Sequence, residues 1–158
     1  MEEYGFINNF QRIGSVSNAS VGERFENAAM AYYAQNGVSL QKPFELAVGV
    51  GSYKKDRKFD LGSASDKILV ECKSHRWTSD DNVPSAKMTV WNEAMYYFHL
   101  VPDEFLRVLF VLRHYSEKRA ETLAEYYVRT YLHLIPSGVK IIEFDEETGD
   151  VLEFCATP

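Results

Sequence analysis

Charged residues interrupt a stretch that otherwise reads as a buried strand. The apolar run of Lys67–Cys72 predicts a strand heading into a core, yet Glu71 and Lys73 stand at its end. Side chains alternate across a strand, so these two share one face, with Cα atoms about 7 Å apart, and Cys72 lies on the other. Charged residues are rarely buried unless they are paired or bind metal. The end of this strand is therefore a candidate site.

A second carboxylate precedes this strand. Asp60 lies in a predicted strand over residues 58–63, and if the two strands pair, Asp60 and Glu71 can face the same way. Two converging carboxylates become favourable when they share a hard cation such as Mg²⁺ or Mn²⁺, with the backbone carbonyl of Cys72 as a further ligand. Lys73 can orient a water molecule or stabilise developing negative charge. This combination suits metal-assisted phosphodiester hydrolysis.

The elements that would position these residues follow from periodicity and turn signals. We expect a helix over residues 20–37, capped by Ser20 with Glu23 in a capping box and ended at Gly37. The remaining expectations run in chain order: a strand over 42–53, a hairpin loop over 54–57, strands over 58–63 and 67–75, a helix over 79–101, a strand over 105–115, a helix over 116–136 and a hairpin over 139–154. The weakly patterned residues 1–19 predict a short helix and loop. The fold class expected is α/β, an α+β sandwich whose central mixed β-sheet is flanked by helices.

The second helix and the last hairpin carry more specific expectations. Met88, Trp91, Met95 and Phe98 form an apolar stripe at helical spacing, which indicates core packing. Gly149 is expected to take the left-handed position of the C-terminal hairpin.

Asp60, a ten-residue spacer and Glu71-Cys72-Lys73 together resemble the signature of the PD-(D/E)XK nuclease superfamily, the restriction endonuclease-like proteins. The element order resembles its αβββαβ core, here followed by a helix and a hairpin. The resemblance covers roughly residues 22–115. It departs from the family pattern at Phe59, where many members have proline.

The resemblance implies roles for further residues. The run Gly22 to Glu26 is similar to the family pattern G-x-x-F-E, which gives Glu26 a catalytic role beside Asp60, Glu71 and Lys73. Glu23 competes for that role, although it is also the expected capping-box acid. Three further residues are candidate substrate-binding residues: His75, Arg76 and Lys87. Solvent exposure is the alternative for each of these three, and for Glu26.

Composition limits the class of protein. The 158 residues, 46% of them apolar, fit a single domain over 1–158 without a membrane span. The net charge of −6 argues mildly against a large nucleic-acid surface, but residues 52–76 hold seven basic side chains against four acidic ones. The first ten residues lack a signal-peptide pattern, which predicts a cytoplasmic protein. Cys72 and Cys155 are expected to be reduced thiols, and no histidine pair has zinc-site spacing.

These observations predict a Mg²⁺-dependent endonuclease acting on DNA, a hydrolase of phosphodiester bonds in a restriction, repair or mobile-element setting. The alternative is a catalytically inactive nucleic-acid-binding or assembly module with a nuclease-like fold. A structural protein in which the charges form a surface salt-bridge cluster is the third reading. Cutting both strands of a duplex is commonly achieved by pairing two copies, so a homodimer is compatible with the sequence.

Overall fold

The computed structural model describes residues 18–155, which form a mixed α/β fold. Its helices are α1 (Asn18–Gln35), α2 (Ser85–Leu100), α3 (Leu123–Tyr131) and a 3₁₀ turn, η1 (Leu132–Leu134). Its strands are β1 (Phe44–Val50), β2 (Tyr53–Phe59), β3 (Leu61–Ser63), β4 (Ile68–Lys73), β5 (Leu106–Leu112), β6 (Tyr115–Ser116), β7 (Glu121–Thr122), β8 (Val139–Phe144) and β9 (Val151–Cys155).

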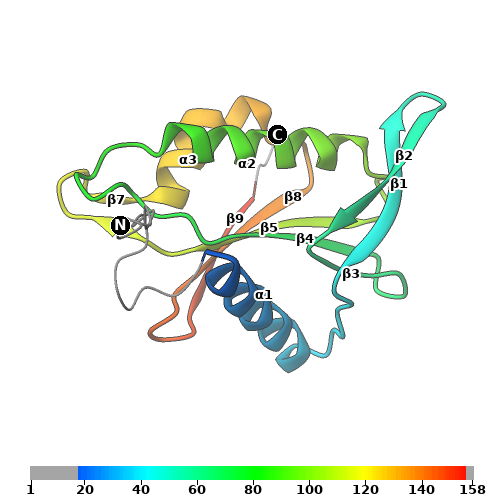
Figure 1. Ribbon diagram of the computed structural model, residues 1–158, viewed down its shortest axis with the longest axis horizontal. Helices are drawn as coiled ribbons and strands as arrows, with labels where there is room; N and C mark the ends of the chain where they lie inside the picture. The colour runs from blue at the N-terminus through cyan, green and yellow to red at the C-terminus, as the bar shows by residue number, and fades with distance from the viewer. Residues whose placement is uncertain (1–17, 156–158) are drawn as a thin grey trace, which may run out of the picture.

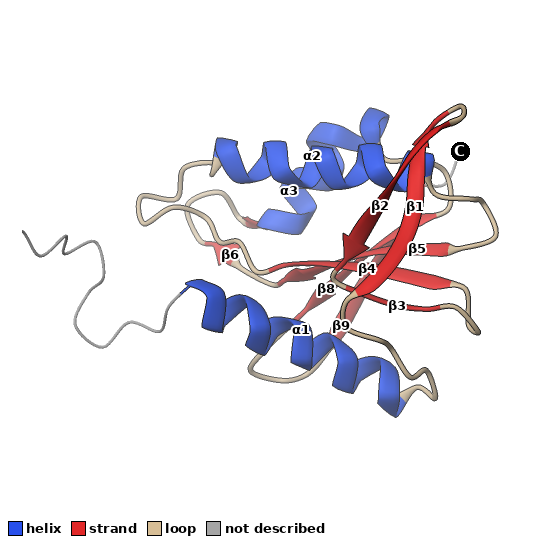
Figure 2. Cartoon of the chain, turned by 45° about the vertical axis from the view of Figure 1, so that its right-hand side comes forward, coloured by secondary structure: helices blue, strands red, loops and turns tan. Residues whose placement is uncertain are grey.

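The main sheet has the strand order β3-β4-β5-β8-β9. The inner strands β4, β5 and β8 are parallel, while β3 and β9 pair antiparallel at the two edges. Helix α1 lies on one face of this sheet, and α2 and α3 lie on the other (Figure 1, Figure 2). The predicted fold class, a mixed sheet flanked by helices, is therefore confirmed.

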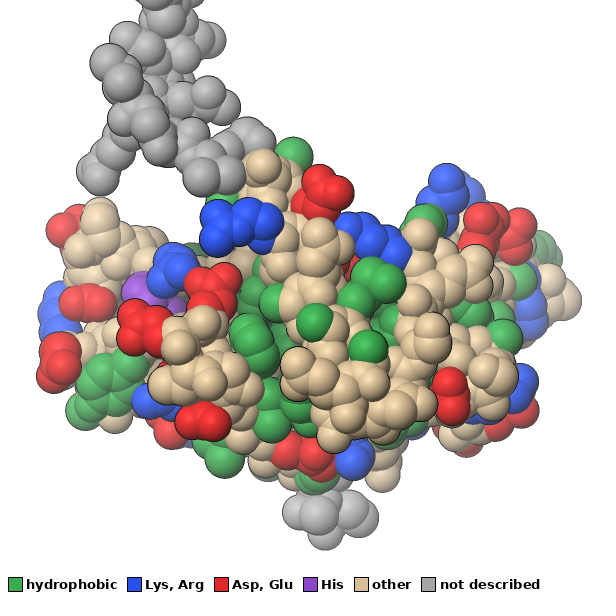
Figure 3. Space-filling model, turned by 90° about the horizontal axis from the view of Figure 1, so that it is seen from below, with side chains coloured by type: hydrophobic (Ala, Val, Ile, Leu, Met, Phe, Trp, Pro, Cys, Tyr) green, Lys and Arg blue, Asp and Glu red, His purple; other side chains and the backbone are tan. Residues whose placement is uncertain are grey.

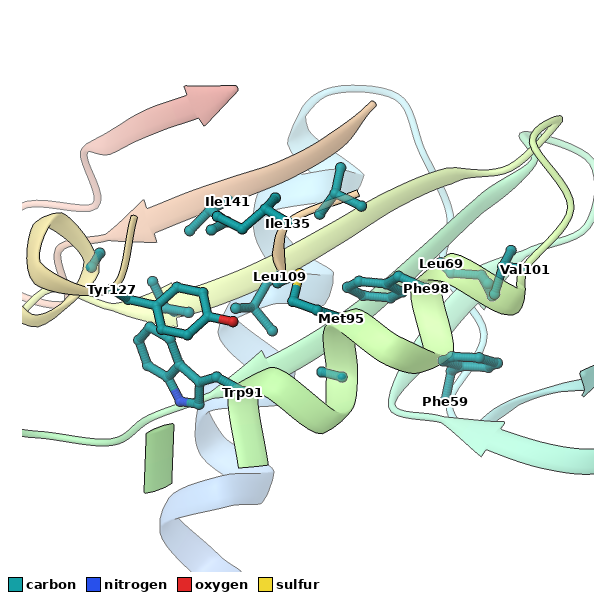
Figure 4. Close-up of a cluster of buried hydrophobic side chains, with 14 of the residues drawn as sticks. Phe59, Leu69, Trp91, Met95, Phe98, Val101, Leu109, Tyr127, Ile135 and Ile141 are labelled. Carbon is teal, nitrogen blue, oxygen red and sulfur yellow. The ribbon is translucent and has the colours of Figure 1, made fainter. Parts of the chain in front are cut away.

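The central strands are apolar because both faces of the sheet are covered. Six of the seven residues of β5 are buried. On the face beneath α2 and α3, Trp91, Met95 and Phe98 pack over Leu109 and Ile141 (Figure 4). The predicted stripe of α2, from Met88 to Phe98, is fully buried in this layer, which confirms its packing role.

On the opposite face, α1 packs Phe25 against Phe110 of β5, with ring centroids 5.4 Å apart. Phe144 of β8 joins them, 5.4 Å from Phe110. Figure 3 views the molecule from this side and shows hydrophobic side chains between the polar and charged ones. The two cores therefore hold β4 and β5 between α1 and α2.

Several boundaries differ from the sequence prediction. The helix expected over 79–101 begins only at Ser85, and the strand expected over 58–63 is divided at Asp60 between β2 and β3. Residues 54–57 were expected to be a hairpin loop but belong to β2, and the turn lies at Gly51, whose φ is +59°. Residues 116–122 were expected to begin the third helix, but they contain the β6–β7 hairpin, and α3 begins only after the cap residue Thr122. Helix α1 already includes Asn18, so Ser20, expected at the start of this helix, lies within it.

The inclusion of residues 54–57 in β2 has a clear physical cause. Charged side chains can occupy a strand when that strand projects into solvent, and β2 pairs with β1 along its whole length, from Phe44 opposite Phe59 to Val50 opposite Tyr53. Gly49 is required there because a Cβ at that position would overlap the carbonyl oxygen of Tyr53. Gly149 has a φ of +77° in the β8–β9 hairpin, as predicted.

Two remaining expectations concern the chain as a whole. The predicted short helix and loop at residues 1–19 fall almost entirely outside the described residues. Within residues 18–155, no helix is both long and apolar enough to cross a membrane.

Candidate active site

Asp60 and Glu71 are brought together by strand pairing at one edge of the main sheet. Strand β3 runs antiparallel to β4, with Leu61 opposite Val70. Asp60 directly precedes β3, and continuing this register sets it opposite Glu71. The Asp60 side chain bends across to β4, where its Oδ2 accepts a hydrogen bond of 2.8 Å from the backbone N–H of Cys72. This bond fixes Asp60 beside the strand that carries Glu71.

Glu71 is a buried carboxylate, with only 3% of its surface exposed. Burial and the nearby negative charge of Asp60 raise the pKa of Glu71 to about 7, although Lys73 and Arg57 oppose that shift. The raised pKa means that the protein does not fully compensate an ionised Glu71. Perturbation by desolvation together with a second carboxylate is typical of functional sites.

Two cations contact Glu71 from different strands. Lys73 Nζ lies 3.4 Å from Glu71 Oε2, two residues along the same face of β4. Arg57 of β2 donates from Nη2 to Glu71 Oε1 at 3.2 Å. The Arg57 guanidinium also lies over the ring of Tyr97, 3.6 Å from its centroid, which fixes it against α2. Asp60, Glu71, Arg57 and Lys73 therefore form a cluster of two acids and two bases.

His75, predicted to bind substrate, lies just beyond β4 against α2. Its Nδ1 accepts a hydrogen bond of 2.8 Å from Trp91 Nε1, so in the neutral ring the proton resides on Nε2. Burial, followed by the positive charges of Lys87 and Lys73, lowers the pKa of His75 to about 4. His75 is thus neutral at pH 7, and Lys73 and Lys87 each lie within electrostatic range of it.

Glu26 lies on the α1 side of β4, where it forms a salt bridge of 2.8 Å with Lys42. Its negative charge also acts on Cys72. Burial raises the pKa of the Cys72 thiol most, and the negative charges of Asp60, Glu26 and Glu71 raise it further. Glu26 is partly buried whereas Glu23 is exposed, so of the two glutamates Glu26 is the one that turns toward the sheet. Its direct ionic partner is nevertheless Lys42.

Arg76 points toward a different part of the molecule. Its guanidinium lies 3.5 Å from Glu146, in the loop between β8 and β9, and it lines a hollow with Arg113 and Asp145. Residues 74–78 follow β4 without regular secondary structure, and there His75 contacts Trp91 whereas Arg76 contacts Glu146. The structure thus directs His75 toward Trp91 of α2 and Arg76 toward the β8–β9 loop.

Asp60 and Glu71 are the carboxylates available to the expected Mg²⁺ or Mn²⁺. Within residues 18–155, no group of three or more His, Cys, Asp or Glu side chains is arranged to hold a metal ion. Mg²⁺ in proteins commonly uses one or two carboxylates and fills its other positions with water or substrate oxygen. Asp60 and Glu71 fit that smaller requirement, and their repulsion, evident in the raised pKa of Glu71, is what a shared cation would relieve.

Sequence reasoning missed Arg57 and Lys42. Arg57 was assigned to a loop, but counting back two residues from Phe59 along a strand would have set Arg57 on the same face as Phe59. Lys42 stands before a strand, at a position where neither periodicity nor a motif singles out one lysine. Its pairing with Glu26 arises from the packing of α1 against the sheet.

Comparison with known proteins adds no relative: the chain matches no protein-family model, no curated protein and no solved structure.

Proposed function

We propose that this protein is a metal-dependent nuclease that hydrolyses phosphodiester bonds in DNA. The observation that carries the proposal is the convergence of Asp60 and Glu71 at one sheet edge with Lys73 on the same strand. A purely structural salt bridge needs one acid and one base, and a second carboxylate makes it less stable. The repulsion is useful if the pair binds a cation.

Asp60 and Glu71 would hold the divalent cation, with the Cys72 carbonyl as the further ligand suggested by the sequence. A bound Mg²⁺ or Mn²⁺ would polarise the scissile phosphate and increase the acidity of a bound water molecule. The four-residue cluster is formally neutral when both acids are ionised, so it becomes positive once a divalent cation is bound. A net positive site is complementary to a phosphodiester.

The remaining residues supply binding and charge stabilisation. Lys73 is held at the end of β4, where its ammonium can stabilise negative charge that develops on the phosphate oxygens. The Arg57 side chain is 24% exposed, so its guanidinium would add positive charge beside a bound phosphate. His75, neutral and protonated on Nε2, can donate a hydrogen bond to phosphate without adding charge, and Lys87 can add a phosphate contact.

The proposal has consequences for partners. DNA would be the macromolecular substrate, and the protein would act in the cytoplasm. Cutting both strands of a duplex would call for a second copy of this chain.

A nucleic-acid-binding module without catalysis is the second candidate. One observation favours it: Glu71 already has two cationic partners, Arg57 and Lys73, so the cluster can be satisfied without a metal ion. The two candidates differ in what they require of Asp60. A nuclease needs its carboxylate as a ligand, whereas a binding module would gain affinity for phosphate if the charge were removed.

The test combines a calorimetric Mn²⁺ titration with a cleavage assay on mixed DNA and RNA, in Mg²⁺, Mn²⁺ or EDTA. Asp60→Asn should abolish both metal binding and cleavage. Lys73→Ala should bind Mn²⁺ nearly as well as wild type, because an ammonium is not a ligand, yet cleave about 100-fold more slowly.

The matched controls are Asp66→Asn and Lys67→Ala, which alter an acid and a base near the site in sequence. Both should cleave at the wild-type rate. Cleavage by Lys73→Ala at the wild-type rate would remove the catalytic role assigned to this motif. If the wild-type protein binds nucleic acid but does not bind Mn²⁺ and does not cleave, the binding module is established instead.

A further inference from the structure

The β1–β2 hairpin, residues 44–59, projects from the body of the molecule beside the end of α2 (Figure 1, Figure 2). We call it the basic arm. It carries four basic side chains against two acidic ones, Glu45 and Asp56, in a chain whose net charge is −6. The basic residues all lie on β2: Lys54, Lys55, Arg57 and Lys58. Positive charge is thus concentrated on one projecting element.

The outer part of the arm is exposed, while its base is fixed. Residues 53–56 of β2 are all exposed, which corresponds to about 13 Å of extended strand. Tyr53, next to the turn, is 87% exposed. At the base, Phe59 is fully buried and Arg57 is fixed between Tyr97 and Glu71. The arm is therefore an anchored two-stranded ribbon with a solvated end.

We propose that the basic arm binds in the major groove of duplex DNA. That groove is about 12 Å wide and 8.5 Å deep and admits a two-stranded β-ribbon. The exposed length of the arm is sufficient for this depth, and the lysines of β2 can contact the phosphates that border the groove. The A-form major groove of duplex RNA is too narrow for such a ribbon, which favours DNA.

The arm also leads directly to the candidate active site. Strand β2 ends at Phe59, next to Asp60, and Lys54 lies six residues before Asp60, about 20 Å away along an extended strand. Arg57 joins the two regions because it belongs to the arm and contacts Glu71. A duplex held by the arm would thus present a nearby phosphodiester to Asp60 and Glu71. This inference rests on the proposed function for the identity of the ligand as DNA.

A polar cleft of about 400 Å³ lies between the arm and α2, lined by residues that include Lys55, Lys58 and Tyr97. Its lining also includes the acids Glu45 and Asp56, so the cleft is of mixed charge, and the lysines at its rim are the groups available to phosphate. The exposed end of the arm, not the cleft, is therefore the main contact surface.

The experiment measures binding of a fluorescent 20-base-pair DNA duplex by anisotropy, in EDTA, over a range of salt concentrations. The test variant is Lys54→Gln/Lys55→Gln/Lys58→Gln. The control, Lys67→Gln/Lys118→Gln/Lys140→Gln, removes the same charge from other surfaces. The arm variant should bind at least about 10-fold more weakly, with the slope of log K against log salt reduced by about 2 to 3, since each lost phosphate contact lowers it by about 0.9. The control should bind like wild type.

Equal losses of affinity in the two triple variants would mean that the effect comes from net charge, and this would overturn the proposal. Unchanged affinity in the arm variant, or no binding by the wild-type protein, would overturn it as well. A single strand or duplex RNA bound as tightly as duplex DNA would overturn the groove assignment. The nuclease proposal fails separately. If DNA binding depends on the arm but no cleavage occurs in Mg²⁺ or Mn²⁺, the arm proposal holds and the nuclease proposal fails. If cleavage occurs but binding does not depend on the arm, the nuclease proposal holds and the arm proposal fails.

Discussion

Glu71 on β4 and Glu143 on β8 are both buried glutamates on the sheet face covered by α2 and α3, with 3% and 2% of their surfaces exposed. Glu143 accepts hydrogen bonds from Arg113 Nη1 at 3.0 Å and from the hydroxyl of Thr122. Each of its oxygens thus has a donor. Glu71 also has two donors, but a second carboxylate, Asp60, lies beside it and contributes to its raised pKa.

The difference separates a structural carboxylate from a candidate functional one. Thr122 is the N-cap of α3 and accepts from the Glu125 backbone N–H, so its bond to Glu143 ties the start of that helix to β8. Buried charge is tolerated there because donors satisfy it. At Glu71 the protein retains a repulsion that an apolar or neutral residue would avoid. Local structure that opposes stability is expected at sites of function.

The largest expected contrast is in cleavage. Glu71→Gln should reduce the rate at least about 1,000-fold, corresponding to roughly 4 kcal/mol, because an amide is a poor ligand for a hard cation. Glu143→Gln should cleave at the wild-type rate once its folded fraction is taken into account. The measurement is single-turnover cleavage in Mg²⁺ at a temperature where circular dichroism finds both variants folded. Comparable losses in both variants would show that burial alone, not the second carboxylate, governs activity.

The next contrast concerns the pH dependence of stability. The pKa of Glu71 is raised from 4.5 to about 7 in the folded state, so the folded protein holds this proton more tightly than the unfolded chain. The contribution of the protonated Glu71 to the free energy of unfolding is fully present below pH 4.5 and is lost as the pH rises through 7. At pH 8 the loss is on the order of 3 kcal/mol, since each pKa unit corresponds to about 1.36 kcal/mol.

Glu71→Gln cannot ionise and should escape that loss. In metal-free buffer it should therefore be more stable than wild type at pH 8, and the two should converge toward pH 4.5. Urea unfolding at pH 4.5, 6, 7 and 8 measures the difference. A difference that does not vary with pH would mean that Arg57 and Lys73 compensate the ionised carboxylate fully, and the contrast with Glu143 would then disappear.

The regions around Glu71 and Glu143 show how much of the structure could be predicted from the sequence. Asp60, Glu71 and Lys73 were predictable because strand alternation and the β3–β4 pairing are local rules, and Leu61 does pair with Val70. Arg57 was missed because a run of charged residues reads as a loop unless the strand is known to project into solvent. The Glu143–Thr122 bond joins residues 21 apart, and residues 116–122 were read as helix, so no sequence rule could place that hydroxyl against β8.

The smallest effect tests the structural side of the comparison. Thr122→Ala removes the cap of α3 and one donor to Glu143, so it should lower the free energy of unfolding by about 1 to 2 kcal/mol. Thr89→Ala is the control. Thr89 is an exposed residue within α2, its hydroxyl donates a hydrogen bond to the backbone oxygen of Ser85, and alanine favours helix there. It should change stability by less than about 0.5 kcal/mol.

A double-mutant cycle then assigns the energy. Glu143→Gln replaces a charged acceptor by a neutral amide, so if Thr122 acts through Glu143 the two losses should not add, and the coupling should be about 1 kcal/mol. Urea unfolding at pH 7 of wild type, both single variants and the double variant supplies the four values. Additive losses would mean that Thr122 stabilises α3 only as a cap. Glu143 would then be held by Arg113 alone, a partner whose side chain is 41% exposed, and its difference from Glu71 would rest entirely on the carboxylate of Asp60.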